Sequence, residues 1–201
     1  MRGTVLFSAF CAAGLAGWWM MPLGLRYFLD YHGGRGLEIE ALPAGLLMAM
    51  AKVTGGELRW SHNHSSAQLI TRFAPQAAAL CLPLQAVLVG FVIWRFVKSG
   101  RADGIRYSCA IVLAFILTGK VLSPQYLVWL MPFIAILPEN PRGAARRLFL
   151  LCAVLTTILF PFAFRNLMDF GWFPIVSLNV RNGLLCYLLL DLLAQRKIRK
   201  V

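Results

Sequence analysis

Charged residues are scarce in this sequence, and acidic ones most of all. Only 14% of the 201 residues are charged, with 8 Asp and Glu against 20 Lys and Arg. Soluble domains carry about a quarter of charged residues. The composition is instead 59% hydrophobic, with a mean hydropathy of +0.69. The lipid bilayer is therefore the first environment to consider.

Several catalytic and metal-binding patterns are missing as well. The sequence has no P-loop, no Ser-His-Asp order and no closely spaced pair of cysteines. Its cysteines fall singly in apolar stretches, where we expect small core residues: Cys11, Cys81, Cys109, Cys152 and Cys186. His62 and His64 stand close together without a nearby third ligand. We therefore expect no metal site and no cofactor.

The basic residues raise the question of a nucleic-acid partner, because the net charge is +12. Nucleic-acid binders gather such residues along one face, often interleaved with aromatic side chains. Here they lie between apolar blocks, which is the pattern of membrane proteins with basic cytoplasmic loops. The expected partner is the bilayer, and no nucleic acid is expected.

The apolar blocks predict an all-α fold, a polytopic transmembrane helix bundle forming one domain over residues 1–201. About six blocks approach the roughly 17 to 25 residues that cross a bilayer. They are Val5 to Met21, Pro75 to Val97, Tyr107 to Val121, Tyr126 to Leu137, Leu148 to Phe164 and Trp172 to Ala194. The first resembles a signal peptide, but Trp18 and Trp19 stand where a cleavage site needs small residues. We expect a retained helix.

The third and fourth blocks are each too short to cross alone, and Pro124 separates them. They form either one helix kinked at Pro124 or a short helical hairpin over residues 107–137. A hairpin places the following basic residues on one side: Arg95, Lys98, Arg101, Arg106, Arg142, Arg146, Arg147, Arg196, Lys197, Arg199 and Lys200. The positive-inside rule makes that side cytoplasmic. We favour the hairpin, a cytoplasmic C-terminus and a recessed turn at Lys120.

This topology leaves an outer loop over residues 22–74. Within it, Ala41 to Ala51 is apolar but too short to span, so an interfacial helix is predicted. Pro43 suits its first turn and Gly55 its end. The stretch from Ser61 to Ser66 is polar, and we expect it to be irregular.

Three groups of residues on the outer side are candidates for chemistry. In the first, His32, Arg35, Glu38 and Glu40 surround glycines that let a ligand approach the backbone. Arg35 favours an anion such as a phosphate. Alternatively, Arg35 pairs with one of the two glutamates in a surface loop.

The other two groups hold cations within apolar blocks. Lys120, with Gln125 in the same turn, faces either a cavity or the lipid headgroups. Arg181, beside Asn182 in the outer half of the last block, must find an anion. That anion is a buried acid, for which Asp169 is a candidate, or a ligand phosphate.

Three strings together resemble the C-terminal part of glycosyltransferase family 87, alpha-mannosyltransferase-like bacterial proteins of the GT-C superfamily. The strings are His32-x-x-Arg35-Gly36-x-Glu38-x-Glu40, Lys120-Val-Leu-Ser123-Pro124-Gln125-Tyr126 and Asn179-x-Arg181-Asn182. The resemblance implies a GT-C-like fold in a bacterial inner membrane. It also implies transfer of a mannosyl or related unit from a polyprenyl-phosphate donor to a lipid or glycan acceptor at the outer face.

The resemblance also assigns roles to individual residues. Donor phosphate would bind to Lys120, Arg35, Arg181 and Gln125, and substrate to His32, Glu38, Glu40 and Asn182. The catalytic residue is unknown, because the superfamily places its aspartate in an earlier outer loop. We therefore expect the C-terminal half of a longer enzyme, a truncated or split gene product that lacks the catalytic base, with a separate N-terminal half as a candidate partner. The alternatives are a transporter or lipid-binding membrane protein, and a noncatalytic subunit or remnant.

Overall fold

The computed structural model describes residues 9, 11–17, 24, 27, 30–31, 33–100, 103–138 and 144–194. The chain divides into two compact units, Met1–Arg35 and Gly36–Val201. In the first unit, residues 11–17 are helical and exposed. The rest of the predicted span from Val5 to Met21 lies mostly outside the described residues.

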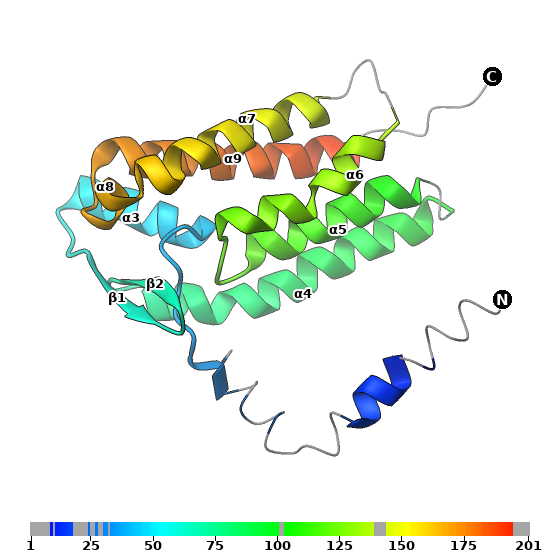
Figure 1. Ribbon diagram of the computed structural model, residues 1–201, viewed down its shortest axis with the longest axis horizontal. Helices are drawn as coiled ribbons and strands as arrows, with labels where there is room; N and C mark the ends of the chain where they lie inside the picture. Colours follow the sequence, from blue (N-terminus) through cyan, green and yellow to red (C-terminus); the bar gives the residue numbers. More distant parts are fainter. Residues whose placement is uncertain are drawn as a thin grey trace. The chain divides into compact units, whose positions relative to one another are not determined.

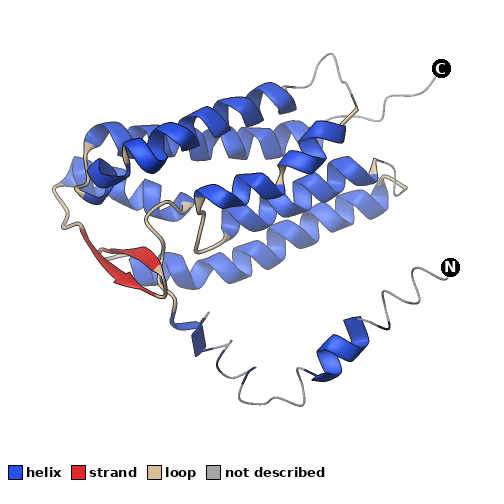
Figure 2. Cartoon of the chain, in the orientation of Figure 1, coloured by secondary structure: helices blue, strands red, loops and turns tan. Residues whose placement is uncertain are grey.

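The second unit is mainly helical (Figures 1 and 2). Its elements in chain order are α3 (Leu42–Thr54), β1 (Arg59–Asn63), β2 (Ser66–Ile70), α4 (Ala74–Lys98), α5 (Gly104–Thr118), the 3-10 helix η1 (Pro124–Trp129), α6 (Met131–Ile136), α7 (Ala145–Thr157), the π-helical η2 (Ile158–Phe162), α8 (Phe164–Met168) and α9 (Trp172–Ala194). These helices lie within a few residues of the predicted blocks. The last block coincides with α9.

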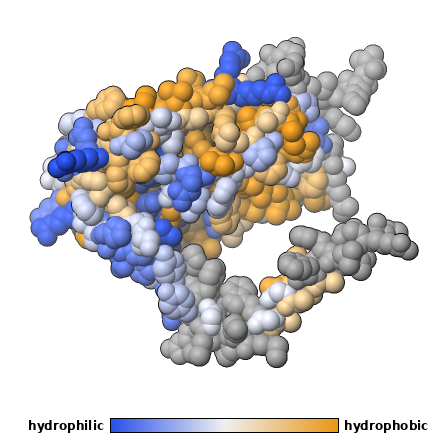
Figure 3. Space-filling view, in the orientation of Figure 1, coloured by the Kyte–Doolittle hydropathy of each residue, from blue (hydrophilic) through white to orange (hydrophobic). Residues whose placement is uncertain are grey.

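Three of the described helical stretches are long and apolar enough to cross a membrane. They are Ala74–Lys98, Ala145–Phe162 and Trp172–Ala194. Gly104–Thr118 and Pro124–Ile136 are apolar but shorter. Hydrophobic residues cover much of the visible side of the helices, and hydrophilic ones gather over the β-hairpin (Figure 3). A mainly helical protein with apolar helices is therefore established, whereas six crossings are not.

The predicted irregular stretch from Ser61 to Ser66 is wrong, and the fold is not purely α-helical. β1 and β2 form an antiparallel hairpin, with Asn63 opposite Ser66. The two turn residues, His64 and Ser65, have φ values of 49° and 56°. Positive φ at both positions is typical of a type I′ turn, whose twist matches that of paired strands. Asn63 supports the turn, because its Oδ1 accepts a hydrogen bond from the His64 N–H at 2.8 Å.

Residues 37–40, which we call the strap, run along the hairpin before α3 begins. The Leu69 N–H donates to the Leu37 carbonyl at 2.8 Å, and the Ile39 N–H donates to the Ala67 carbonyl at 2.9 Å. Just before the strap, the Gly36 N–H donates to Gln68 Oε1 at 3.2 Å. A Cβ at Gly36 would lie 2.6 Å from that oxygen, so a larger residue requires Gln68 to move. The hairpin thereby fixes the path of the strap.

The helices pack around α9, and half of the most apolar stretch of α9 is buried inside the protein. Fully buried Leu113 and Leu185 belong to one core cluster, in contact with residues from α4, α7 and α6. α3 contacts α9 through a polar pair, since Asn179 Nδ2 donates to the Gly45 carbonyl at 2.9 Å. The helix predicted over Ala41 to Ala51 is therefore present as α3, and it is packed against α9.

Arginine side chains join several helix ends at the C-terminal end of α9. Arg95 of α4 donates to the Leu193 carbonyl at 2.9 Å, and Arg106 of α5 donates to the Leu192 carbonyl at 3.0 Å. The Ala144 N–H, just before α7, donates to Asp191 at 3.3 Å. The chain from α5 to α7 therefore leaves this end and returns to it (Figure 1). Lys98, Arg146 and Arg147 are described and exposed. Six further predicted cytoplasmic cations lie outside the described residues: Arg101, Arg142, Arg196, Lys197, Arg199 and Lys200.

Candidate functional site

The strap covers the turn that follows α5. α5 stops at Thr118, and Gly119 is already extended. Ser123 is extended too, as expected for a residue before proline. The Glu38 N–H donates to the Lys120 carbonyl at 2.9 Å. The strap therefore covers part of the irregular backbone of this turn.

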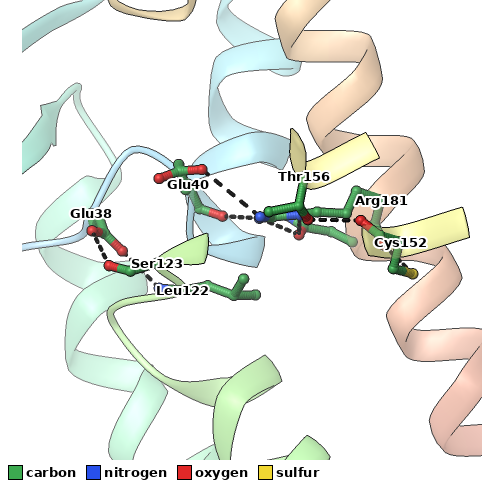
Figure 4. Close-up of polar contacts among 8 residues, drawn as sticks. Glu38, Glu40, Leu122, Ser123, Cys152, Thr156 and Arg181 are labelled. Atoms are coloured by element: carbon green, nitrogen blue, oxygen red, sulfur yellow. Dashed lines mark hydrogen bonds and ion pairs between the residues drawn. The ribbon is translucent and has the colours of Figure 1, made fainter. Parts of the chain in front are cut away.

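Glu38 holds this turn with both of its carboxylate oxygens (Figure 4). Its Oε2 accepts a hydrogen bond from the Leu122 N–H at 2.7 Å, and its Oε1 accepts one from the Ser123 hydroxyl at 2.8 Å. Glu38 is only 7% exposed. Short hydrogen bonds to a buried carboxylate are stronger than neutral ones. Glu38 therefore fastens the strap to residues more than 80 positions away in the sequence.

Arg181 on α9 holds the other end of the strap (Figure 4). Its Nη2 donates to the Glu40 backbone carbonyl at 2.9 Å, and its Nη1 lies 3.8 Å from Glu40 Oε1. Its Nε and Nη2 also donate to Asn182 Oδ1 at 3.1 and 2.9 Å. Arg181 is fully buried. The acidic partner of Arg181 is therefore Glu40, not the neighbouring Asp169.

The Glu40–Arg181 contact leaves polar atoms unsatisfied. Glu40 Oε1, Arg181 Nη1 and Asn182 Nδ2 are buried without a hydrogen-bond partner among the described residues. Burial raises the pKa of Glu40 to about 7, with Arg181 lowering it and the Glu38 carboxylate raising it. This carboxyl therefore gains or loses a proton near neutral pH.

A residue of α7 contacts the backbone of Arg181. Cys152 Sγ donates to the Arg181 backbone carbonyl at 3.8 Å, and Thr156 Oγ1 donates to the Cys152 carbonyl at 2.7 Å. Neither residue was a candidate from the sequence, nor was Ser123. Ser123 stands within the most specific string of the family resemblance, which was the available signal. Cys152 and Thr156 carry no such signal.

The remaining candidate site residues lie in different parts of the chain and do not all meet at the strap. Lys120 is partly buried in the covered turn, and Gln125 is exposed on η1. Arg35 belongs to the other unit, so its place relative to these residues is not defined. His32 lies outside the described residues. Among the described residues, no group of three metal-binding side chains occurs.

We call Glu38, Glu40, Leu122, Ser123, Arg181 and Asn182 the strap site. At this site, residues from the three sequence strings of the family resemblance, which are far apart in the chain, contact one another. These contacts are buried, and several involve charged groups. Comparison with protein-family models, curated proteins and solved structures finds no match for this chain. The arrangement offers one cation, Arg181, to an anion and can exchange a proton at Glu40.

Proposed function

We propose that this chain is a membrane protein that forms the lipid-phosphate-binding half of a glycosyltransferase. In this proposal the donor is a polyprenyl-phosphate-linked mannose or related sugar, and the acceptor is a lipid or glycan at the outer face. A separate N-terminal half supplies the catalytic carboxylate. The convergence of the three strings at the strap site is the observation that carries the proposal.

The placement in the membrane follows from the distribution of charge and apolar helices. α4, the α7–η2 stretch and α9 are the long apolar helices. The short α5 and the η1–α6 segment form a hairpin whose turn is recessed, and a helix within Val5 to Met21 completes about six crossings. The arginine-rich end faces the cytoplasm of a bacterial cell, as does the C-terminus. The strap site then lies toward the outer side of the inner membrane.

Lys120 and Gln125 are the groups that a donor phosphate reaches most directly. Lys120 is partly buried and Gln125 is exposed, so both are accessible beside the covered turn. A buried or half-buried cation near a lipid-linked phosphate stabilises the charge of the departing group. The family resemblance also assigns donor phosphate to Arg35 and substrate to His32.

In this proposal, Arg181 binds the donor phosphate only after protonation of Glu40 has weakened their ion pair. The guanidinium is fully buried, and within the described part of the chain its Nη1 has no hydrogen-bond partner. Because the pKa of Glu40 is about 7, protonation neutralises its carboxyl near physiological pH. An anionic phosphate can then replace the carboxylate as the partner of Arg181. The proposal assigns the substrate to Glu38, Glu40 and Asn182.

Binding of a synthetic polyprenyl-phosphate mannose to the purified chain in lipid nanodiscs tests the proposal. We expect Lys120→Ala and Gln125→Ala to weaken binding by about tenfold or more, because charge-assisted contacts to phosphate are lost. The matched control is Lys98→Ala, which removes an exposed lysine from the arginine-rich end. The polyprenol without phosphate should bind equally to all variants.

A noncatalytic subunit is the second candidate, and one observation favours it. Both oxygens of Glu38 are already bonded within the chain, and Arg181 is inaccessible. If the phosphate-linked donor binds no better than the free polyprenol, the strap site only stabilises the fold. Equal binding by the Lys120→Ala and Lys98→Ala variants would remove the phosphate-binding assignment.

A further inference from the structure

A second site lies away from the strap site, between the end of α3, the β-hairpin and the start of α4. It is a pocket of about 530 Å³, within the roughly 300–1,000 Å³ of ligand sites. Its lining includes Met50 and Thr54 from α3. None of its lining residues belongs to the family resemblance or to the proposed function.

The pocket combines cations with exposed apolar side chains. Arg59 and Arg72 contribute the positive charge, against Glu57 alone on the negative side. Met50, Ile70 and Phe73 are 44%, 49% and 44% exposed. Large apolar side chains left in water beside arginines are unusual in a soluble protein but suit an amphiphile. The occupant therefore needs an anionic head and an apolar tail.

The existing contacts of the two arginines are weak enough for a ligand to replace. Arg59 lies 3.4 Å from Glu57, but the two side chains are 73% and 84% exposed. Such surface pairs contribute little free energy, because water screens them. Arg72 lies 5.3 Å from the centre of the Phe73 ring, which leaves its N–H donors available to an anion. Arginine matches phosphate oxygens with two parallel hydrogen bonds.

We propose that this pocket binds an anionic phospholipid, with the phosphate between Arg59 and Arg72 and an acyl chain along Met50, Ile70 and Phe73. The proposal rests on the membrane placement given above but not on glycosyl transfer. A lipid bound here joins the end of α3 to the hairpin that carries the strap. The headgroup level of the bilayer then coincides with this pocket.

Native mass spectrometry of the protein in a neutral detergent tests this proposal with three probes. They are dioctanoyl phosphatidylglycerol, dioctanoyl phosphatidylcholine and glycerol phosphate. We expect phosphatidylglycerol to bind most tightly, because it alone combines net negative charge with acyl chains. Arg59→Gln and Arg72→Gln should each weaken it by about fivefold, the effect of one basic residue near a lipid surface.

Matched variants distinguish binding in this pocket from nonspecific attraction to basic residues elsewhere on the surface. Lys98→Gln and Arg147→Gln remove the same two charges from exposed positions at the other end, and they should leave phosphatidylglycerol binding unchanged. Glu57→Gln should strengthen binding, since it removes the competing carboxylate. Ile70→Ser should weaken both phospholipids equally.

Three results would overturn the proposal. One is equal affinity for phosphatidylglycerol and phosphatidylcholine. Another is equal affinity for glycerol phosphate, which would identify a site for a water-soluble phosphate. The third is an equal loss of affinity in the control pair. Binding of polyprenyl-phosphate mannose should depend on Lys120 and not on Arg59 or Arg72, so the two proposals fail independently.

Discussion

The strap site and the C-terminal end of α9 both bury arginine, but they neutralise it differently. At the end of α9, Arg95 and Arg106 donate to the carbonyls of Leu193 and Leu192. The last carbonyls of a helix have no intrahelical partner and carry partial negative charge. Arginine there satisfies groups that every helix end possesses.

Arg181 lies within α9, where the helix carbonyls are already bonded. It binds instead the carbonyl and carboxylate of Glu40, from a segment about 140 positions away in the sequence. A buried ion pair is costly to form and more costly to break on one side. The helix terminus itself accounts for the arginines at the end of α9, whereas it does not account for the pairing of Arg181 with Glu40.

Removing Arg181 should have the largest effect on stability. Arg181→Met leaves the Glu40 carboxylate buried without its cation, and we expect a loss of about 3–5 kcal/mol in the free energy of unfolding at pH 8. Unfolding in a mixed detergent–denaturant titration measures it. Arg181→Met combined with Glu40→Gln should recover much of the loss. If the double variant is as unstable as the sum of the single ones, the two residues are not coupled.

The pH dependence of stability should be the next largest effect. The pKa of Glu40 is raised from 4.5 in a model compound to about 7 in the folded protein. The folded state therefore holds this proton more tightly than the unfolded chain. Stability from this group is fully present below pH 4.5 and is lost as the pH rises through about 7, on the order of 3 kcal/mol.

We would measure the thermal unfolding midpoints of the unmodified protein and of Glu40→Gln from pH 4.5 to 8. Their difference isolates the contribution of Glu40 to the pH dependence of stability. We expect the difference between the two to change across this range, because the amide does not titrate. Burial raises the pKa of Glu40 most, and the charges of Arg181 and Glu38 also act on it, so neither of these two residues is altered in this experiment. A constant difference at all pH values would show that folding does not shift the pKa of Glu40.

Glu38 should show a smaller effect than the ion pair. Glu38→Ala leaves the buried Leu122 N–H without its acceptor and the Ser123 hydroxyl without its partner. We expect a loss of about 2 kcal/mol in unfolding free energy. Glu57→Ala is the control, because that side chain is 84% exposed and should change stability by less than about 0.5 kcal/mol. Similar losses in both variants would contradict the role given to Glu38.

Much of the helical layout follows from sequence, because apolar length decides where helices lie. The bounds of α9 coincide with the predicted block, and α4 extends the predicted one by a residue at each end. The hairpin was missed for a local reason. β1 has the sequence Arg-Trp-Ser-His-Asn with no apolar alternation, and its turn lacks the glycine that usually marks a type I′ turn.

The partner of Arg181 could not be predicted from the sequence, for a different reason. Asp169 was a candidate partner because it lies in the loop before α9, but Arg181 lies well inside that helix. Glu40 reaches Arg181 only because the hairpin directs the strap across α9. Long-range pairing of this kind depends on tertiary packing, which neither spacing nor composition encodes. The convergence of Glu38 with Ser123 has the same origin.

The smallest effect should come from the helix-end region, at Asp103. Its carboxylate lies 3.1 Å from Arg106 Nη2 but is 40% exposed, so water screens the pair. Asp103 has a φ of 58°, a conformation that asparagine tolerates as well as aspartate. Asp103→Asn therefore removes the charge alone, and we expect a change below about 0.5 kcal/mol in unfolding free energy. A loss as large as that of Glu38→Ala would erase the difference between the two regions, because Arg106 would then depend on a carboxylate as Arg181 does.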